Sequence, residues 1–107
     1  MLNQKKLDTK ILENMIVAEQ LSNPSSVSIS AGTVGTYANR AEIDCTKAGY
    51  TLIGAFIKGV SNPGSYHASV TGVINDVTVY VSLYRATGSA VTVAKGEIVI
   101  IALYKKS

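Results

Sequence analysis

A chain of 107 residues is long enough for one domain and too short for two independent hydrophobic cores. Hydrophobic residues make up 47% of it, which excludes global disorder, while charged residues make up only 16%. The net charge of +3 is not gathered into a basic stripe, so the sequence predicts no nucleic-acid partner. Polarity comes instead from Ser, Thr and Asn, which favour strands and turns, so an all-β fold is expected.

Residues 1–24 differ in pattern from the rest of the chain. Their apolar residues recur at a three-to-four spacing that favours one helical face, and Asn23-Pro24 ends the pattern. Three interpretations fit: a helix that packs on its own domain, a short coiled-coil stem with Asn14 as a register-setting residue, and an extended arm. Each would serve packing or oligomerisation. The apolar positions are Leu7, Ile11, Leu12, Met15, Ile16, Ala18 and Leu21.

From residue 25 to residue 107 short strands alternate with turn residues, which predicts one β domain. The clearest alternation places four apolar side chains inward. It follows directly after Asn75-Asp76, where a tight turn is expected. Six to eight antiparallel strands at this spacing predict a β-sandwich or jelly roll. The inward row is Val77, Val79, Val81 and Leu83. Further strands are expected at 27–29, 40–46, 50–60, 66–74, 91–93 and 97–104.

Two of the expected strands, around Phe56 and around Ile100, are apolar on both faces. A strand of a two-layered sandwich should have one face in water, so these strands need further cover. The N-terminal helix could cover one of them. A symmetric homo-oligomer would cover both, and the sparse surface charge favours it. The residues expected at the oligomer interface are Leu52, Phe56, Ile98, Ile100, Tyr80 and Tyr84.

The inventory of reactive side chains argues against an enzyme. His67 is the single histidine, and as a catalytic base it would need a nucleophile and an orienting carboxylate. Asp44 and Cys45 are adjacent on an expected strand, so their side chains point to opposite faces and cannot both join His67. One histidine, one cysteine and scattered acids form no metal-ligand cluster. We therefore expect neither enzymatic activity nor a metal or other cofactor.

A ligand site is expected in the loop before the strand at 66–74. Asn62, Ser65, Tyr66 and His67 combine an aromatic face with hydrogen-bonding groups, which is the chemistry that a sugar requires. In the alternative interpretation, Tyr66 and His67 begin a strand and pack at a subunit boundary.

Two further aromatic groups are weaker candidates. Tyr80 and Tyr84 with Arg85 lie opposite the inward valines, where they would cover a sheet or an interface. Tyr37, close to Asn39 and Arg40, is the third candidate.

Parts of the chain resemble a known family of domains. The run Lys47-Ala48-Gly49-Tyr50-Thr51-Leu52-Ile53-Gly54, a following polar loop, the run Thr78-Val79-Tyr80-Val81 and the segment 98–104 carry the resemblance. From residue 27 to its end the chain resembles the C-terminal head or tip domains of tail-fibre and baseplate receptor-binding proteins in phages and prophages of Gram-positive bacteria. The resemblance implies a homotrimeric β-sandwich at the tip of a tail appendage that adheres to cell-surface carbohydrate, with other tail proteins as further partners.

The expected location follows from the resemblance and from the N-terminus. A member of this family would lie in the virion, or in the bacterial cytoplasm when expressed from a prophage. No apolar segment reaches membrane-spanning or signal-peptide length, so we expect no membrane partner and no signal peptide.

Three functions remain open at this point. The first is a trimeric tail protein that binds a bacterial surface glycan or caps a fibre. The second is a ligand-free structural or assembly subunit of a phage particle. The third is a monomeric, lectin-like carbohydrate-binding module.

Overall fold

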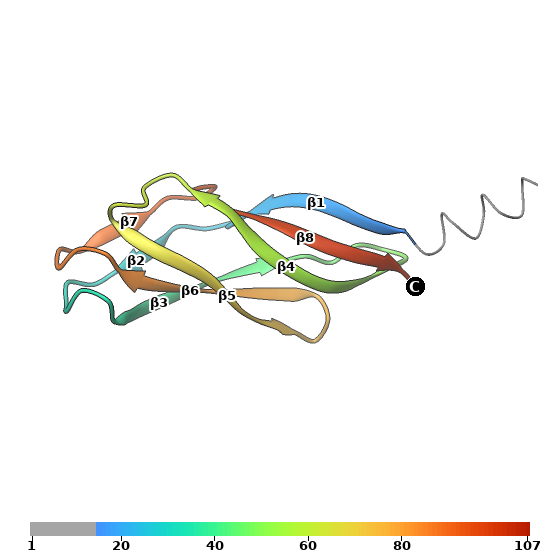
Figure 1. The fold of residues 1–107 in the computed structure, drawn as a ribbon, viewed down its shortest axis with the longest axis horizontal. Helices are drawn as coiled ribbons and strands as arrows, with labels where there is room; N and C mark the ends of the chain where they lie inside the picture. Colours follow the sequence, from blue (N-terminus) through green and yellow to red (C-terminus); the bar gives the residue numbers. More distant parts are fainter. Residues whose placement is uncertain (1–14) are drawn as a thin grey trace, which may run out of the picture.

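A computed structural model describes residues 15–107, which form eight strands and no helix (Figure 1). Every strand pairing in this part of the chain is antiparallel, so the expected all-β antiparallel class is confirmed. The strands are β1 (Ile16–Ser22), β2 (Val27–Ile29), β3 (Tyr37–Asp44), β4 (Tyr50–Val60), β5 (Tyr66–Ile74), β6 (Thr78–Arg85), β7 (Val91–Val93) and β8 (Ile98–Lys106).

The N-terminal helix expected up to Asn23 is wrong for residues 16–22, which form β1. This strand pairs with β8 from Ile16 opposite Lys105 to Ser22 opposite Val99. Hydrogen bonding to the edge of β8 gives these residues a tertiary partner, which outweighs a helical spacing of only a few residues. The sheet therefore starts ahead of residue 25. The first part of the expected helix, stem or arm, including Asn14, lies outside the described residues.

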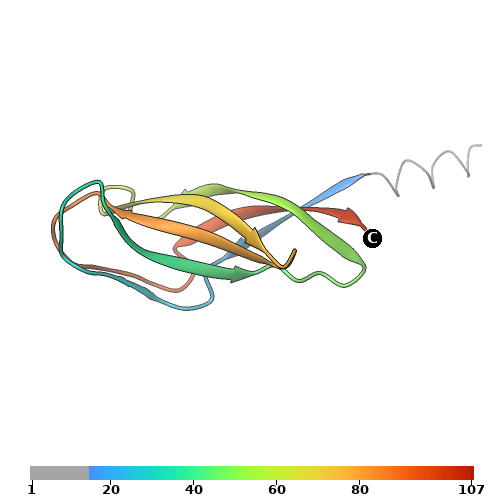
Figure 2. The ribbon, with the colours of Figure 1, turned by 90° about the horizontal axis from the view of Figure 1, so that it is seen from below.

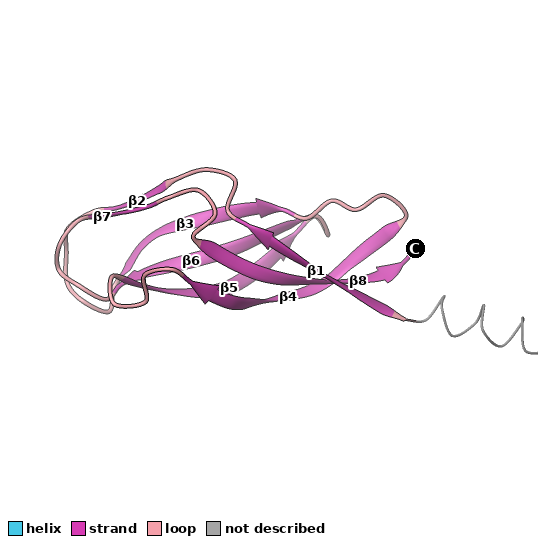
Figure 3. Ribbon diagram, turned by 90° about the horizontal axis from the view of Figure 1, so that it is seen from above, coloured by secondary structure: helices cyan, strands magenta, loops and turns pink. Residues whose placement is uncertain are grey.

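The strands form two facing three-stranded sheets, with strand orders β1-β8-β4 and β3-β6-β5 (Figures 1 and 2). A short third pairing, β2 with β7, continues from β1 and β8 beyond a corner at one end of the molecule (Figure 3). Pairs are nested along the chain, because β1 pairs with β8, β2 with β7 and β3 with β6. The arrangement is sandwich-like, and each sheet has one inward and one outward face.

The hydrophobic core fills the space between the two sheets. The inward row expected on β6 is confirmed for Val79, Val81 and Leu83, all of which are fully buried. Val77 instead lies in the turn before β6 and is 37% exposed. The opposite sheet contributes four buried residues of β8, namely Ile98, Ile100, Ala102 and Tyr104.

The β5–β6 turn and the sheet edges show specific backbone features. Asn75 and Asp76 both have positive φ, 53° and 58°, as a tight type I′ turn requires, so the expected turn is confirmed. The registers of β3, β4 and β5 shift at bulges. These lie between Tyr37 and Asn39, Leu52 and Gly54, Ile57 and Gly59, and Val70 and Gly72.

Asn23 joins the two corners of the molecule. Its side chain is buried, with Nδ2 donating to the carbonyls of Ser25 (2.9 Å) and Ala94 (3.0 Å) and Oδ1 accepting from the Ile98 amide (2.9 Å). Its own backbone amide donates to the Ile98 carbonyl, and its carbonyl accepts from the Gly96 amide. One side chain thereby fixes the β1–β2 corner against the β7–β8 corner.

Two core tyrosines have bonded hydroxyls. The Tyr104 hydroxyl donates to the Cys45 carbonyl at 2.8 Å, and the Tyr66 hydroxyl donates to Glu97 at 3.3 Å. Burial, followed by smaller effects of Glu97, raises the pKa of Tyr66 to about 12. Burial, followed by smaller effects of neighbouring groups, likewise raises the pKa of Tyr104 to about 12. Both hydroxyls are therefore held in the neutral form by the fold.

The substitution Asn23→Ala should lower the free energy of unfolding by about 2 to 3 kcal/mol, because it leaves the Ile98 amide and the Ala94 carbonyl without their partner. Urea unfolding measures this loss. Asn62→Ala, at an exposed loop position, serves as the matched control and should change stability by less than about 0.5 kcal/mol. Equal effects of the two substitutions would contradict a fixing role for Asn23.

Stability should fall as pH rises from about 10 toward about 12, because the tyrosines release their protons near pH 10 when unfolded and near pH 12 when folded. The folded state then binds more protons than the unfolded state over this window. Urea unfolding at several pH values measures the slope. It should be shallower in the double variant Tyr66→Phe and Tyr104→Phe, and identical slopes would rule this contribution out.

Candidate functional site

An aromatic row crosses the outer face of the β3-β6-β5 sheet. Tyr84 of β6 is paired with Tyr37 of β3 on one side and with His67 of β5 on the other. Cross-strand partners lie on the same face of a sheet, and the neighbouring Leu83 points into the core, so the three rings point outward. The rings of Tyr37 and Tyr84 meet edge to face with centroids 6.0 Å apart. Tyr37 is 54% exposed, and His67 is exposed.

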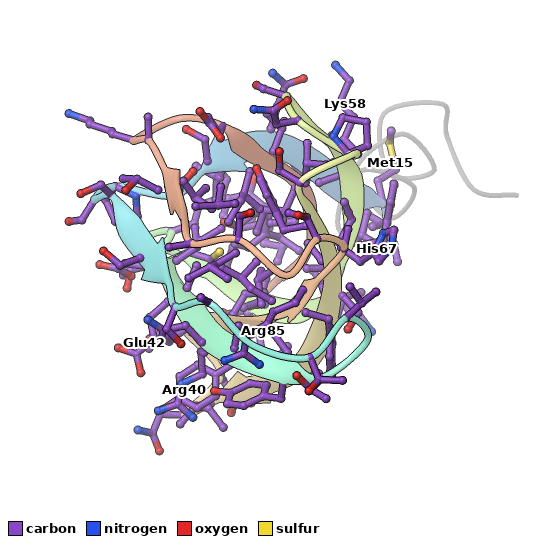
Figure 4. All side chains as sticks on the ribbon, turned by 90° about the vertical axis from the view of Figure 1, so that its left-hand side faces the viewer. Met15, Arg40, Glu42, Lys58, His67 and Arg85 are labelled. Carbon is purple, nitrogen blue, oxygen red and sulfur yellow. The ribbon has the colours of Figure 1, made fainter. Side chains whose placement is uncertain are left out.

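A charged pair lies on the same face beside this row. The Arg40 guanidinium stacks 4.1 Å from the centroid of the Tyr80 ring and lies 3.5 Å from the Glu42 carboxylate. Arg40 and Glu42 project outward from β3, on the opposite side of the sheet's width from His67 (Figure 4). One positive and one negative charge leave this part of the face without a net charge.

Hydroxyl groups fill the centre of the same face. Ser82 is paired with Ser69 on β5 and with Arg40 on β3. The Thr71 hydroxyl, at the bulge of β5, lies 2.8 Å from the Ser82 hydroxyl. The face therefore combines aromatic rings, hydroxyls and a balanced ion pair, and none of these residues belongs to the core cluster.

Of the four residues expected to bind a ligand, the structure brings only His67 into this row. The expectation that Tyr66 lies on the surface is wrong, because its side chain is fully buried in the core. It lies one strand position away from His67. Alternation along a strand places neighbours on opposite faces, so both could not face the same ligand. Asn62 and Ser65 form a turn, closed by the Ser65 amide on the Asn62 carbonyl at 2.9 Å. That turn precedes the sheet face and contributes no ring to it.

Arg85, expected beside Tyr84 as a binding residue, is used within the fold. Its Nε donates to the Ser30 carbonyl, and its guanidinium also donates to the Ser30 hydroxyl, the Thr36 hydroxyl and the Tyr37 carbonyl, at 2.6 to 3.0 Å. The group packs against Gly32, where a Cβ would lie 2.6 Å from Nε. Arg85 therefore holds the segment 30–37 in place and positions Tyr37 at the start of β3.

The outer face of the other sheet is chemically different. Ile101 of β8 is paired with Gln20 of β1 and Phe56 of β4, and Leu103 is paired with Ala18 and Gly54. We call the resulting surface the apolar face. Its members are Ile16, Ala18, Ile53, Phe56, Val99, Ile101 and Leu103.

Large side chains of the apolar face are open to solvent. Ile16, Ile53 and Phe56 are 53%, 48% and 51% exposed. At one end the face is bounded by Lys58, whose Nζ donates to the Gln20 side chain. Lys58 and Met15 both project from this layer of the molecule (Figure 4). Lys58 is the one charged residue of β4, and β8 carries no charge before Lys105. The face between Lys58 and Lys105 is therefore free of charge on these two strands.

Three of the residues expected at an oligomer interface lie in the core of the single chain instead. Leu52, Ile98 and Ile100 are 4%, 0% and 0% exposed, because their side chains point toward the opposite sheet. Phe56 does point outward and belongs to the apolar face. Tyr80 and Tyr84 are half-buried on the other sheet, where they form the polar aromatic surface. The expectation that β8 is apolar on both faces is correct. Its outer surface, however, is formed by the residues that alternate with Ile98 and Ile100, and these two point into the core.

A groove of about 380 Å³ runs beside the free edge of β3. Asn23, Ser25, Asn39, Arg40 and Glu42 are among its polar lining residues. The side-chain Nδ2 of Asn39 donates to the Ser28 carbonyl at 2.9 Å. The groove adds hydrogen-bonding groups to the Arg40 side of the polar face.

Within residues 15–107, no three histidine, cysteine or acidic side chains lie together as a metal site would require. Burial, followed by the charge of Asp44, raises the pKa of the Cys45 thiol, which lies in the core. A raised pKa disfavours the thiolate, so the geometry does not present Cys45 as a nucleophile. No helix in the described part of the chain is long and apolar enough to cross a membrane.

Comparison with known proteins found no matching family, no similar curated protein and no similar solved structure.

Gly32→Ala should destabilise the fold by about 1 to 3 kcal/mol, because the added methyl displaces the Arg85 guanidinium from its bonds to the segment 30–37. Urea unfolding of the single and double variants measures the coupling. In an Arg85→Ala background the same Gly32→Ala change should have almost no further effect. Gly64→Ala, at a position where a Cβ meets no atom within 4 Å, is the matched control. Additive effects of the two substitutions would exclude this packing relation.

Proposed function

We propose that this protein is a structural protein of a phage or prophage tail whose β-sandwich domain assembles into a homotrimer and adheres to bacterial surface carbohydrate. The observation that carries the proposal is the apolar face of the β1-β8-β4 sheet. Assembly through this face would leave the polar aromatic face of the β3-β6-β5 sheet turned outward. The proposed location is the virion, or the bacterial cytoplasm during expression from a prophage.

The case for assembly is energetic. Fully burying a Phe or Ile side chain stabilises by roughly 1.5–3 kcal/mol, so half-exposed Ile16, Ile53 and Phe56 could contribute on the order of 3 kcal/mol per protomer. Contiguous exposed apolar surface on a soluble domain is typical of an interaction site. A three-fold assembly would bring the apolar faces of its three copies together around the symmetry axis.

The trimeric state, the tail location and the carbohydrate ligand are supported by the resemblance of residues 27–107 to receptor-binding head and tip domains. The all-β class agrees with what that resemblance implies. The nested pairs β1 with β8, β2 with β7 and β3 with β6 support a classification among sandwiches and jelly rolls.

A second candidate function, a ligand-free assembly subunit of a phage particle, is favoured by the same apolar face. It differs from the first only in what the polar aromatic face does. Binding of intact Gram-positive cell walls by the assembled protein separates the two candidates, since a subunit without a ligand would stay in the supernatant.

Phe56→Lys should dissociate the oligomer, because it places a charge in the centre of the apolar face while the side chain is half-exposed in the single chain. The molar mass in solution, measured by light scattering over a dilution series, should fall from three chains to one. The association should weaken by at least about tenfold. Val34→Lys is the matched control, because Val34 is 58% exposed and lies in the loop before β3.

A wild-type protein that stays a single chain at micromolar concentration would overturn the assembly proposal. The third function, a monomeric lectin-like module, would then be favoured. A trimer that Phe56→Lys leaves intact would place the interface elsewhere.

A further inference from the structure

We infer that the aromatic row formed by Tyr37, Tyr84 and His67 is a binding site for a neutral oligosaccharide, lying across the β3-β6-β5 sheet and not in the loop around Asn62. This inference rests on the proposed adhesion to carbohydrate and assigns it a place and a ligand class. It is carried by the exposure, the spacing and the charge of the side chains on this face.

The rings of the row are available to a ligand. Tyr37 is 54% exposed, and His67 is exposed at the other end of the row. In the described residues, the hydroxyls of the core tyrosines Tyr66 and Tyr104 are bonded to protein groups, whereas no such bond engages the hydroxyls of Tyr37 and Tyr84. The outer rings therefore offer both a stacking surface and hydrogen-bonding groups, which is what the two faces of a pyranose ring require.

The row is also fixed in position before a ligand arrives. Tyr37 contacts the Tyr84 ring, and its backbone carbonyl accepts a hydrogen bond from Arg85 at 2.9 Å. Tyr84 is held within the central strand of the sheet. A site on rigid strands loses little conformational entropy when a ligand binds. This small cost helps a ligand that makes few strong contacts, such as a sugar, to bind.

The dimensions suit a short oligosaccharide. Tyr37 and His67 lie on strands separated by one intervening strand, so the row spans two interstrand spacings, roughly 10 Å. This is about the length of two linked sugar rings. The exposed hydroxyls of Ser69 and Thr71 lie beside the row, where they can bond the sugar's own hydroxyl groups, and the buried Ser82 hydroxyl holds that of Thr71 at 2.8 Å.

The charges on the face select a neutral ligand. Arg40 is already opposed by Glu42 and stacked on Tyr80, and the Arg85 guanidinium is occupied by Ser30, Thr36 and Tyr37. An anionic polymer such as a phosphodiester chain would need uncompensated cations, which this face does not offer among the described residues. A sugar without charge needs only rings and hydroxyls.

The test uses the full chain on an array that carries neutral oligosaccharides of glucose, galactose and N-acetylglucosamine, together with uronic-acid and phosphorylated members. The wild type should bind neutral members. Tyr37→Ala and His67→Ala should each weaken that binding by about tenfold, the effect of losing one ring contact. Asn62→Ala and Val77→Ser, outside the row, should leave the binding unchanged. Urea unfolding should show that all four variants remain folded.

Each alternative outcome overturns the inference in a distinct way. Binding that survives both row substitutions, or that Asn62→Ala abolishes, would show that the site lies elsewhere while adhesion itself stands. Binding confined to the anionic members would exclude the neutral ligand class. No binding by an oligomeric wild type would exclude carbohydrate adhesion and leave the assembly subunit, whose test is the mass in solution.

Discussion

The structure depends on β8, which is hydrogen-bonded along both edges to β1 and β4. Because it is the central strand of its sheet, its backbone groups are satisfied by its own chain, and its side chains are free to serve two surfaces. Ile98, Ile100 and Ala102 alternate into the core with complete burial. Between them, Val99 and Ile101 point the other way. A strand that is apolar at every position from Ile98 to Leu103 thus builds the core and the outer surface at the same time.

The outward faces of the two sheets carry chemically different side chains. β6 is also a central strand, but its outward positions are Tyr80, Ser82 and Tyr84, which tolerate water and one another. The outward positions of β8 from Val99 to Leu103 are aliphatic, and Lys105 follows them at the end of the strand. The molecule is therefore two-sided, with one face that gains from losing water and one face that can exchange water for hydroxyl groups. This division is what the proposed function uses, with assembly assigned to the first face and recognition to the second.

Much of the fold was predictable where a local pattern and tertiary contacts agree. The alternation ending at Leu83 and the turn at Asn75-Asp76 were identified correctly, because period-two burial and positive φ leave clear signals in a sequence. The strand at 16–22 was not identified, since its pairing with β8 spans about eighty positions of the chain and leaves no local trace. The buried partners of Asn23 are equally distant along the sequence.

The site was predictable in composition and not in place. Tyr37, His67, Tyr80 and Tyr84 were all identified as aromatic candidates, but their grouping depends on cross-strand register, which a single sequence does not reveal. Tyr66 shows the limit most clearly. A shift of one position along β5 decides whether a ring lies in solvent or in the core. The sequence of β5 alone does not show which of its alternating positions point inward.

The bulges of β3, β4 and β5 bear on how copies of this protein can come together. These strands are three of the outer edges of the two sheets, and each shifts register once or more along its length. An interrupted edge is a poor template for a neighbouring strand, so edge-to-edge pairing of copies through β3, β4 or β5 is disfavoured. β1, the fourth edge, keeps an unbroken register with β8, so the interruptions act at three of the four edges.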